Sequence, residues 1–495
     1  MSSDSSSQPP QSPDSLSFKT KLAFGAGDMG PAITANVLVF FLLYFFTEVA
    51  RLPPGLAGSI LLIGKIADGV NDPIIGYLSD RTESKRWGRR HSWMLYGALP
   101  FGILFFLQWI VPPLGDPPAN PWPLFLYYVA IGILFNLAFT AVNLPYTALT
   151  PELTKNYDER TKLNSFRFAF SIGGSILSVI LVIVLTELVS DLRQQYLWIG
   201  LTCAVLSTLP IYWCIWGTRR QAMGAEERRL SKPQQESIPL FAQLRIVFSN
   251  RAFLFVIGIY LCSWLAVQLT AANLKFFVES WMNLSAQVAN IAILAVQGTA
   301  LLMLFVWSAL SEKIGKKAVY GVGMGFWILA QAGLFFLQPG QLSLMYGLAI
   351  LSGIGVSTAY LIPWSMLPDV IELDELKTGQ RREGIFYAFM VLLQKLGLAL
   401  GLQLVGWSLE WSGYIGGATQ QPDSALLAIR IVVGPLPMVC LLIGLVLAYF
   451  YPITKDIHAE MLLKLEERRK RDAIGENGTA ENGTREDSTA QNDTA

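Results

Sequence analysis

Three ionisable side chains stand in one apolar stretch of the sequence near residue 70. Lys65, Asp68 and Asp72 are spaced three and four residues apart, so a helix would carry all three on one stripe. An ionised group at the centre of a bilayer costs roughly 2.5 to 3.5 kcal/mol, so three unpaired groups would cost on the order of 10 kcal/mol. Chains keep such groups for a cation site, a proton relay or the polar wall of a solute cavity inside a helix bundle.

The charges of this stripe do not balance by themselves. Two carboxylates stand against one local ammonium, so a second buried ammonium or a bound cation must supply the missing positive charge. Lys395, in a later apolar span, is the candidate ammonium and is expected to couple the stripe to the other half of the molecule. Two interpretations stay open, namely a cation-linked site and an ionic lock that only fixes helix packing.

The chemistry of the stripe suits two coupling ions. Asp and Asn oxygens suit a hard cation such as sodium, while a buried carboxylate with a raised pKa could carry a proton instead. We therefore expect Na+ or H+ as the coupling ion, with sodium held at Asp68 and Asp72. No other cofactor is expected.

The composition indicates a membrane protein. Of the 495 residues 53% are hydrophobic and 15% are charged, which is more apolar than a soluble domain. Windows of about 20 apolar residues occur twelve times along the chain. We therefore predict an all-α membrane protein with twelve transmembrane helices and no separate water-soluble domain.

Basic residues set the expected topology. Most of the 37 Lys and Arg residues fall in segments on one side of the predicted spans, which places both termini in the cytoplasm and the protein in the cell's inner or plasma membrane. The formal net charge of +1 gives no reason to expect a nucleic-acid partner. Neither a nucleotide-binding glycine loop nor a nucleophile elbow occurs, so we predict that the protein is not an enzyme.

The two halves of the sequence repeat each other. The run Gly88 to Arg90 matches Gly315 to Lys317, and Pro145 to Glu152 matches Pro363 to Asp369. Repeated six-helix units are the sequence mark of the major facilitator fold, in which two bundles rock around a site near the midplane. We divide the chain into a disordered tail at 1–20, bundles at 21–217 and 251–452, a cytoplasmic linker at 218–250 and a mostly disordered cytoplasmic tail at 453–495.

Charged residues at the predicted cytoplasmic helix ends indicate gating and not solute binding. Such residues can pair with one another and with helix dipoles, which would close that side of the protein in an outward-open state. The predicted gating residues are Asp80, Arg81, Arg89, Arg90, Glu152 and Arg160.

Three segments together resemble the glycoside-pentoside-hexuronide:cation symporter family, whose best-known member is melibiose permease. They are Asp68 to Gly76, Asn143 to Thr150 and Lys377 to Gly384, and the resemblance extends from about Lys21 to Tyr451. It implies the major facilitator fold and sodium- or proton-coupled symport of a sugar, glycoside or related organic solute by alternating access. Carried over by position, it implies cation binding at Asp68, Asn71, Asp72 and Asn143 and coupling roles for Arg167 and Lys395, to which the stripe itself adds Lys65.

The chain departs from that family at two positions. The helix 1 aspartate that holds the sugar falls on Ala32, and the helix 4 carboxylate shared by sugar and cation falls on Asn143. Asp28 lies one helical turn before Ala32, about 6 Å away, and could partly replace the missing acid. Asn143 can form hydrogen bonds but cannot titrate or supply charge.

A second resemblance widens the choice of solute. The run Pro363 to Ile371 is similar to the sodium-dependent lysophospholipid symporters of vertebrates. That resemblance implies an alternative, a cation-coupled transporter of a lysophospholipid or another amphipathic solute. A non-transporting sensor or a lipid scramblase on the same fold is a further alternative.

Polar and aromatic residues within the apolar spans are candidates for the solute cavity. Unsatisfied polar groups in a membrane are costly, so each could instead bond a neighbouring helix, and aromatic rings could stack on a sugar face. The expected partners are a small solute, a monovalent cation and the bilayer, with the protein a monomer. The candidates are Asp28, Asn143, Tyr146, Gln268, Asn273, Gln297, Trp364, Tyr387 and Gln394.

Overall fold

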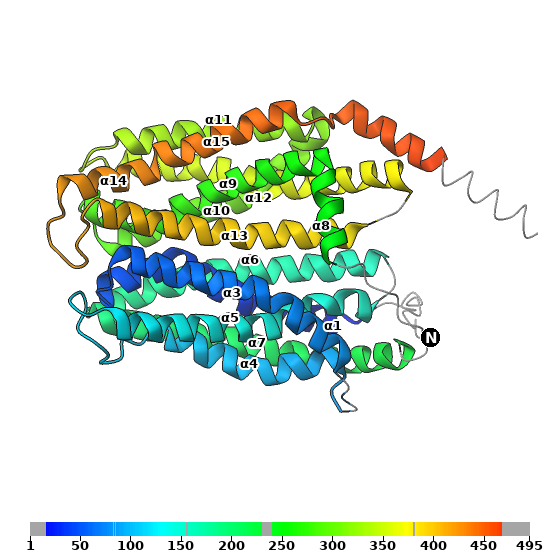
Figure 1. Ribbon diagram of the computed structural model, residues 1–495, viewed down its shortest axis with the longest axis horizontal. Coiled ribbons are helices and arrows are strands. Elements are labelled where there is room, and N and C mark those ends of the chain that lie inside the picture. The colour runs from blue at the N-terminus through cyan, green and yellow to red at the C-terminus, as the bar shows by residue number, and fades with distance from the viewer. Residues whose placement is uncertain are drawn as a thin grey trace, which may run out of the picture.

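Long helices that run side by side make up nearly the whole molecule (Figure 1). This computed structural model describes residues 16–82, 84, 86–154, 157–229, 240–379 and 382–467. Within them there is no β-strand, only an isolated bridge between Asp116 and Asn120. We call the end of the molecule that carries the described chain ends the terminal side, and the other end the opposite side.

The first bundle begins with a bent span. It joins α1 (Phe18–Ala26), α2 (Met29–Val37) and two π-helical turns, η1 (Leu38–Leu42) and η2 (Phe45–Val49). The bend falls at Gly27, where an added Cβ would lie 2.4 Å from the ring of Tyr146, so only glycine permits this packing. The bundle continues with α3 (Pro54–Arg81), α4 (Arg89–Leu107), α5 (Trp122–Leu153), α6 (Tyr157–Leu188) and α7 (Leu192–Arg229).

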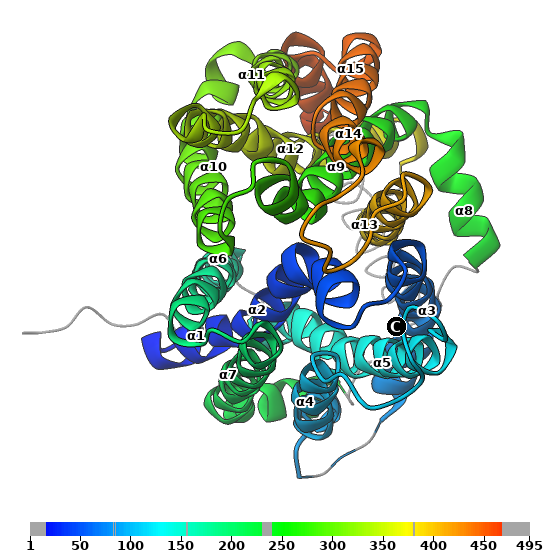
Figure 2. The same ribbon diagram turned by 90° about the vertical axis from the view of Figure 1, so that its left-hand side faces the viewer.

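The second bundle follows α8 (Leu240–Ser249) and faces the first (Figure 2). Contacts join α13 to α3, α10 to α6 and α9 to η1 across the interface between the bundles. The elements of the second bundle are α9 (Arg251–Phe276), η3 (Phe277–Trp281), α10 (Ala286–Ile314), α11 (Lys316–Phe336), α12 (Leu342–Thr378), α13 (Glu383–Trp411), α14 (Asp423–Val433) and α15 (Pro435–Phe450).

Ten helical spans of the described chain are long and apolar enough to cross a membrane, compared with the twelve predicted. The two other predicted spans are α3 and α4. The charged stripe makes α3 less apolar, and α4 is short and begins with Arg89, Arg90 and His91. Both helices pack against α5 within the bundle, so the twelve-helix arrangement stands although these two helices are unusually polar.

The α3 and α13 helices approach each other closely near the opposite side. An added Cβ on Gly406 would lie 2.5 Å from the carbonyl oxygen of Pro54, and one on Gly58 would lie 3.2 Å from the Cα of Gln403. Glycine therefore lets the two backbones touch at this level. The contact joins the two bundles on the side away from the chain ends.

The predicted linker and tail are more helical than expected. The α7 helix continues to Arg229 and α8 forms from Leu240, so both ends of the predicted linker are helical; residues 230–239 lie outside the described part. Residues 455–467 are also helical, and Met461 and Leu465, four residues apart, are buried. This apolar spacing docks one helix face on the protein, so residues 455–467 are an ordered part of the tail that was predicted to be mostly disordered. Residues 1–15 and 468–495 lie outside the described residues.

Candidate functional site

The charged stripe of α3 faces a neutral polar stripe on α5. Asn136 and Thr140 have the same four-residue spacing as Asp68 and Asp72, so each pair shares one helix face. The Lys65 ammonium donates to the amide oxygen of Asn136 at 2.9 Å. The Thr140 hydroxyl lies 2.9 Å from Oδ1 of Asp68 and 3.0 Å from Oδ1 of Asp72, and with one proton it donates to one of them at a time.

Lys395 reaches this stripe from α13, in the other bundle. Its Nζ lies 3.0 Å from Oδ2 of Asp68 and 2.5 Å from Oδ2 of Asp72. The Lys65 ammonium lies 3.5 Å from the same oxygen of Asp68. Two ammonium groups therefore balance two carboxylates, and the charge count that required a second ammonium is met by Lys395. We call Lys65, Asp68, Asp72 and Lys395 the cation cluster.

The two acids of the cation cluster differ in exposure. Asp68 is fully buried, whereas 29% of the Asp72 side chain is exposed, so Asp72 is the more accessible of the two acids. Asn143, one turn beyond Thr140 on α5, has a buried amide oxygen without a hydrogen-bond partner among the described residues. Asn71 is half-buried and forms none of the hydrogen bonds that join the described residues of the cluster.

A second charged group lies between α2 and α6. The Arg167 Nε lies 3.3 Å from Oδ2 of Asp28, which precedes the first residue of α2. The Arg167 guanidinium also lies 5.7 Å from the centre of the Tyr146 ring. Tyr146 is fully buried and its hydroxyl donates to the backbone oxygen of Phe24 at 2.9 Å. Tyr146 therefore has no exposed surface that a solute could contact in this conformation. The Asp28–Arg167 ion pair supplies the polar atoms of this group.

The predicted cavity residues of the second bundle divide into two sets. Trp364 and Tyr387 stack with ring centres 6.2 Å apart, and both are partly exposed; Gln394 is half-buried next to Lys395. The other set lies between helices. Gln268 and Asn273 are buried, with Asn273 donating to the backbone oxygen of Ile429 at 2.7 Å, and Gln297 donates across the two bundles to Asn36 at 2.9 Å.

The predicted gating residues pair within the first bundle. The Arg89 Nη2 lies 2.5 Å and the Arg90 Nε 3.2 Å from Oε1 of Glu152. Arg160 donates through Nε to the backbone oxygen of Thr154 at 2.9 Å. Arg81 is exposed, and its guanidinium lies 4.1 Å from the centre of the Tyr77 ring. Asp80 precedes Arg81 at the end of α3, but its side chain lies outside the described part of the structure.

The second bundle repeats this arrangement. Gly315, with φ of 86°, precedes α11, just as Gly88, with φ of 75°, precedes α4. The residue after Gly315 is Lys316, whose Nζ lies 2.6 Å from Oδ1 of Asp369 on α12. A glycine and a cation at the start of α4 or α11 and an acid on α5 or α12 therefore recur in the two bundles, as the sequence repeat suggested.

A charged group that sequence reasoning missed lies toward the opposite side. The Lys275 ammonium, with 4% of its side chain exposed, lies 3.3 Å from Oε1 of Glu279. It also lies 4.4 Å and 5.4 Å from the ring centres of Tyr44 and Tyr196 in the first bundle. The Tyr44 hydroxyl donates to Oε2 of Glu279 at 2.5 Å. We call Lys275, Glu279, Tyr44 and Tyr196 the opposite-side seal.

A neighbouring set of contacts extends this seal. The Tyr414 hydroxyl and the Gly417 backbone N–H, both from the second bundle, donate to the two oxygens of Glu48 at 2.8 Å each. Arg51 donates to the backbone oxygen of Gly416. The two bundles are therefore joined on the opposite side.

Two spacings in the sequence could have indicated the residues that were missed. Lys275 and Glu279 are four residues apart, which was the signal for the opposite-side seal. Asn136 and Thr140 are also four residues apart, which was the signal for the missed partners of the cation cluster.

Comparisons with known proteins agree with this architecture. A family model described as MFS/sugar transport protein matches residues 23–455. An uncharacterised symporter of Synechocystis sp. is 52% identical over 94% of this chain and 99% of its own length. The sodium-dependent lysophosphatidylcholine symporter 1 of Mus musculus is 27% identical over 90% of this chain and 88% of its own. The crystal structure of a variant of the nucleoside transporter NupG covers 88% of this chain and 99% of its own, with a TM-score of 0.63 and 14% identity.

Two helical bundles with a charged cluster between them define a secondary transporter of the major facilitator fold. The family match covers nearly all of the described chain. The chain therefore belongs to the MFS/sugar transport protein family.

Proposed function

We propose that the coupling cation of this symporter is sodium and that it binds between Asp68 and Asp72. The observation that carries the proposal is the neutral cation cluster, in which Lys395 occupies one oxygen of each acid. A second cation beside Lys395 would leave the site with an uncompensated positive charge in a medium of low dielectric constant. Sodium and the Lys395 ammonium therefore compete for the same oxygens.

This competition supplies a coupling mechanism. Lys395 belongs to the second bundle and the two acids belong to the first, so a sodium ion that displaces Lys395 also removes an ion pair between the bundles. The opposite-side seal then carries more of the contact between them. Cation occupancy would in this way change the balance between the two arrangements of the bundles that alternating access requires.

Oxygen donors around the acids favour sodium over a proton. The Thr140 hydroxyl already lies within 3.0 Å of both carboxylates, and Asn143 holds an unpaired buried amide oxygen on the same face of α5. Hard cations prefer such oxygen ligands, whereas a proton needs only one carboxylate. The mouse relative is named as sodium-dependent, which agrees with this choice.

We further propose that the solute is a sugar or a glycoside, taken up into the cell with the terminal side in the cytoplasm. The Asp28–Arg167 pair offers hydrogen-bonding groups, and the partly exposed Trp364 and Tyr387 rings can stack on a sugar face. A lysophospholipid is the second candidate because the same rings can pack against an acyl chain and the mouse relative is named for such a solute. Each chain contains both bundles, so a monomer suffices.

Proteoliposomes with an imposed sodium or proton gradient test this proposal. Labelled glycosides and labelled lysophosphatidylcholine are offered in parallel, and we expect one glycoside to accumulate only while the sodium gradient lasts. Accumulation of the lysolipid instead would assign the alternative solute. Accumulation driven by a proton gradient alone would overturn the choice of sodium, and saturable binding without flux would make the protein a sensor.

A matched pair of variants tests the residues. Asp72→Asn keeps the size of the side chain but removes half of the anionic charge that a cation needs, so we expect gradient-driven accumulation to be abolished in a protein that still folds. Glu187→Gln, at an exposed carboxyl on α6, serves as the control and should transport normally. Unchanged accumulation in Asp72→Asn would rule out the proposed cation site.

A further inference from the structure

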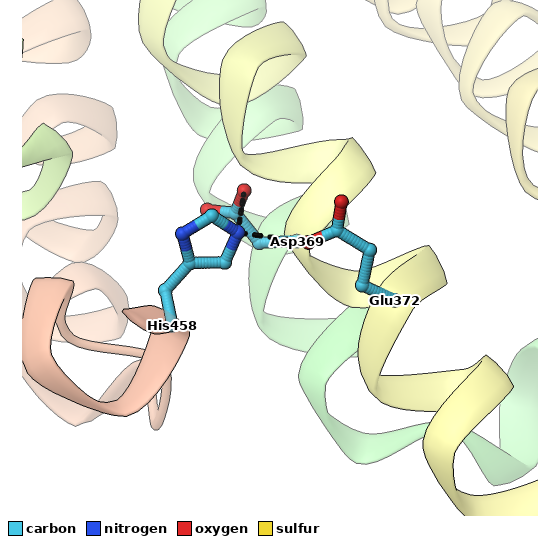
Figure 3. Close-up of side chains that lie close together, drawn as sticks. All are labelled: Asp369, Glu372 and His458. Carbon is cyan, nitrogen blue, oxygen red and sulfur yellow. Dashed lines mark hydrogen bonds and ion pairs between the residues drawn. The ribbon is translucent and has the colours of Figure 1, made fainter. Parts of the chain in front are cut away.

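Three side chains with metal-binding atoms meet away from the cation cluster, between α12 and the segment 455–467 (Figure 3). Asp369 and Glu372 are three residues apart on α12 and therefore share one helix face. His458 comes from the docked helical segment 455–467. Its Nε2 lies 2.8 Å from Oε2 of Glu372 and 3.3 Å from Oδ1 of Asp369, and the ligand atoms of all three residues lie within 4.8 Å of one another.

This set of donors matches the preferences of zinc. One imidazole nitrogen and two carboxylate oxygens are three ligands of the kind that Zn2+ binds, with a water molecule as a fourth. With bonds of about 2.1 Å, tetrahedral ligand atoms lie about 3.4 Å apart. The distances of 2.8 Å and 3.3 Å around His458 are close to this spacing, so small side-chain rotations suffice to admit the ion.

Lys316 orients one of the carboxylates from outside the ligand set. Its ammonium donates to both oxygens of Asp369 at 2.6 Å and 2.8 Å and to the backbone oxygen of Ser365 at 2.6 Å. Carboxylates that bind metals are commonly held by such outer hydrogen bonds. With a neutral histidine, Asp369, Glu372 and Lys316 sum to one negative charge, so the site attracts a cation, and a bound Zn2+ would bring its net charge to +1 beside the open pocket.

A pocket next to these residues supplies a path for the ion. Its volume is about 600 Å³, and its wall includes Asp369, His458, Lys316 and Tyr451. Tyr451 is 3% exposed, and its hydroxyl has no hydrogen-bond partner among the described residues. An unsatisfied buried hydroxyl is costly, and a water molecule on a metal at this place would give it a partner.

We propose that Asp369, Glu372 and His458 form a binding site for a divalent metal ion of the zinc class, which fixes the helical segment 455–467 to α12. The ligands come from two separate elements, so the ion would bridge them, whereas the ion pair alone depends on the charge of His458. The site is distinct from the cation cluster, and its occupancy therefore regulates the docking of the tail and not the chemistry of coupling.

Metal titration of the purified full-length chain tests the proposal. The protein is stripped with a chelator and titrated with Co2+, whose visible absorption reports nitrogen and oxygen ligands, and Zn2+ is then added as a competitor. We expect one Co2+ per chain, displaced by Zn2+, with binding at least tenfold weaker in His458→Ala and weaker in Glu372→Gln. Glu460→Gln, on an exposed face of the same segment, is the matched control and should bind as the unmodified protein does.

Hydrogen exchange of residues 455–467 provides the second measurement. Zn2+ should slow exchange there in the unmodified protein and leave it unchanged in His458→Ala, while sodium-driven uptake by the variant confirms that the membrane part is folded. If the unmodified protein does not bind one Co2+ per chain, then His458 and the two acids form an ion pair only, and the proposal is overturned. Binding that His458→Ala and Glu372→Gln do not weaken would place the metal elsewhere and overturn it as well.

Discussion

Two buried lysines, Lys395 and Lys275, connect the same two bundles in different ways. Lys395 faces two carboxylates, one of which is 29% exposed. Lys275 has one carboxylate partner, and its ammonium also lies beside the rings of Phe41, Tyr44 and Tyr196. In the proposed mechanism a cation replaces the first lysine, because the oxygens of both carboxylates remain for it. The second lysine has the Glu279 carboxylate as its one acidic partner and is otherwise surrounded by aromatic rings, so a cation in its place would find fewer carboxylate ligands.

The surroundings of a buried charge therefore decide whether it can be exchanged. Cation–π contacts contribute about 2 kcal/mol when desolvated and hold an ammonium without offering a strong site to sodium. In the proposed mechanism the cation cluster exchanges its ammonium for an ion, whereas the opposite-side seal opens as a unit. We infer that the first group senses the cation and the second group holds the bundles together on the opposite side.

The largest expected effect on transport comes from Lys395→Ala. Removal of the competing ammonium should strengthen sodium binding by at least tenfold, which is about 1.4 kcal/mol, and abolish accumulation because the cation no longer releases a contact between the bundles. Sodium binding by calorimetry and uptake into proteoliposomes measure the two effects separately. Lys464→Ala, on the exposed tail, is the control. Weaker sodium binding in Lys395→Ala would favour an ionic lock over competition.

Lys275→Met should act mainly on stability. Glu279, with 20% of its side chain exposed, would lose its ammonium partner, and because breaking a fully buried pair costs about 3 to 5 kcal/mol, we expect a loss somewhat below that. The double variant Lys275→Met with Glu279→Gln should regain most of that loss, since no unpaired charge remains. Thermal unfolding in detergent measures the effect. A double variant no more stable than the single one would show that the rings, and not the charges, hold the seal.

The seal should also control access from the opposite side. In Lys275→Met, a cysteine introduced at Ser280 should react faster with a membrane-impermeant maleimide than the same cysteine in an otherwise unmodified chain. Equal labelling rates in both backgrounds would contradict a sealing role for Lys275.

Thr140→Val should have the smallest effect on transport. The variant keeps the shape of the side chain but loses the hydroxyl that contacts both acids, so the sodium concentration for half-maximal uptake should rise about tenfold, or about 1.4 kcal/mol. Thr147→Val is the matched control, since that hydroxyl donates to the backbone of its own helix at Leu144. Equal sodium dependence in the two variants would exclude Thr140 as a sodium ligand.

The cation cluster could be predicted from sequence because charges in a membrane must balance. Lys65, Asp68 and Asp72 share a helix face by their spacing, and the excess of one carboxylate required a partner such as Lys395. Asn136 and Thr140 carry no charge, so no such count required them. Lys275 already has an acid one turn away, so it gave no sign that its remaining neighbours come from the other bundle.

Chain ends and connections were predicted less well than the spans. The repeat with Gly88 and Gly315 could be recognised because each bundle needs the same turn and the same cation after it. The helix at 455–467 was missed because its composition is polar, and only the spacing of Met461 and Leu465 indicated a buried face. The docking of that face depends on α12, which is far away in sequence.

The glycine contact between α3 and α13 has a mechanical consequence. Gly406, where the two backbones touch, lies 11 residues from Lys395 on the same rigid helix, a lever arm of about 16 Å at 1.5 Å per residue. A tilt of about 10° at this fulcrum swings the lysine about 3 Å, which is enough to part it from both aspartates. A small rotation about the glycine contact is thus large enough to break both ion pairs of Lys395.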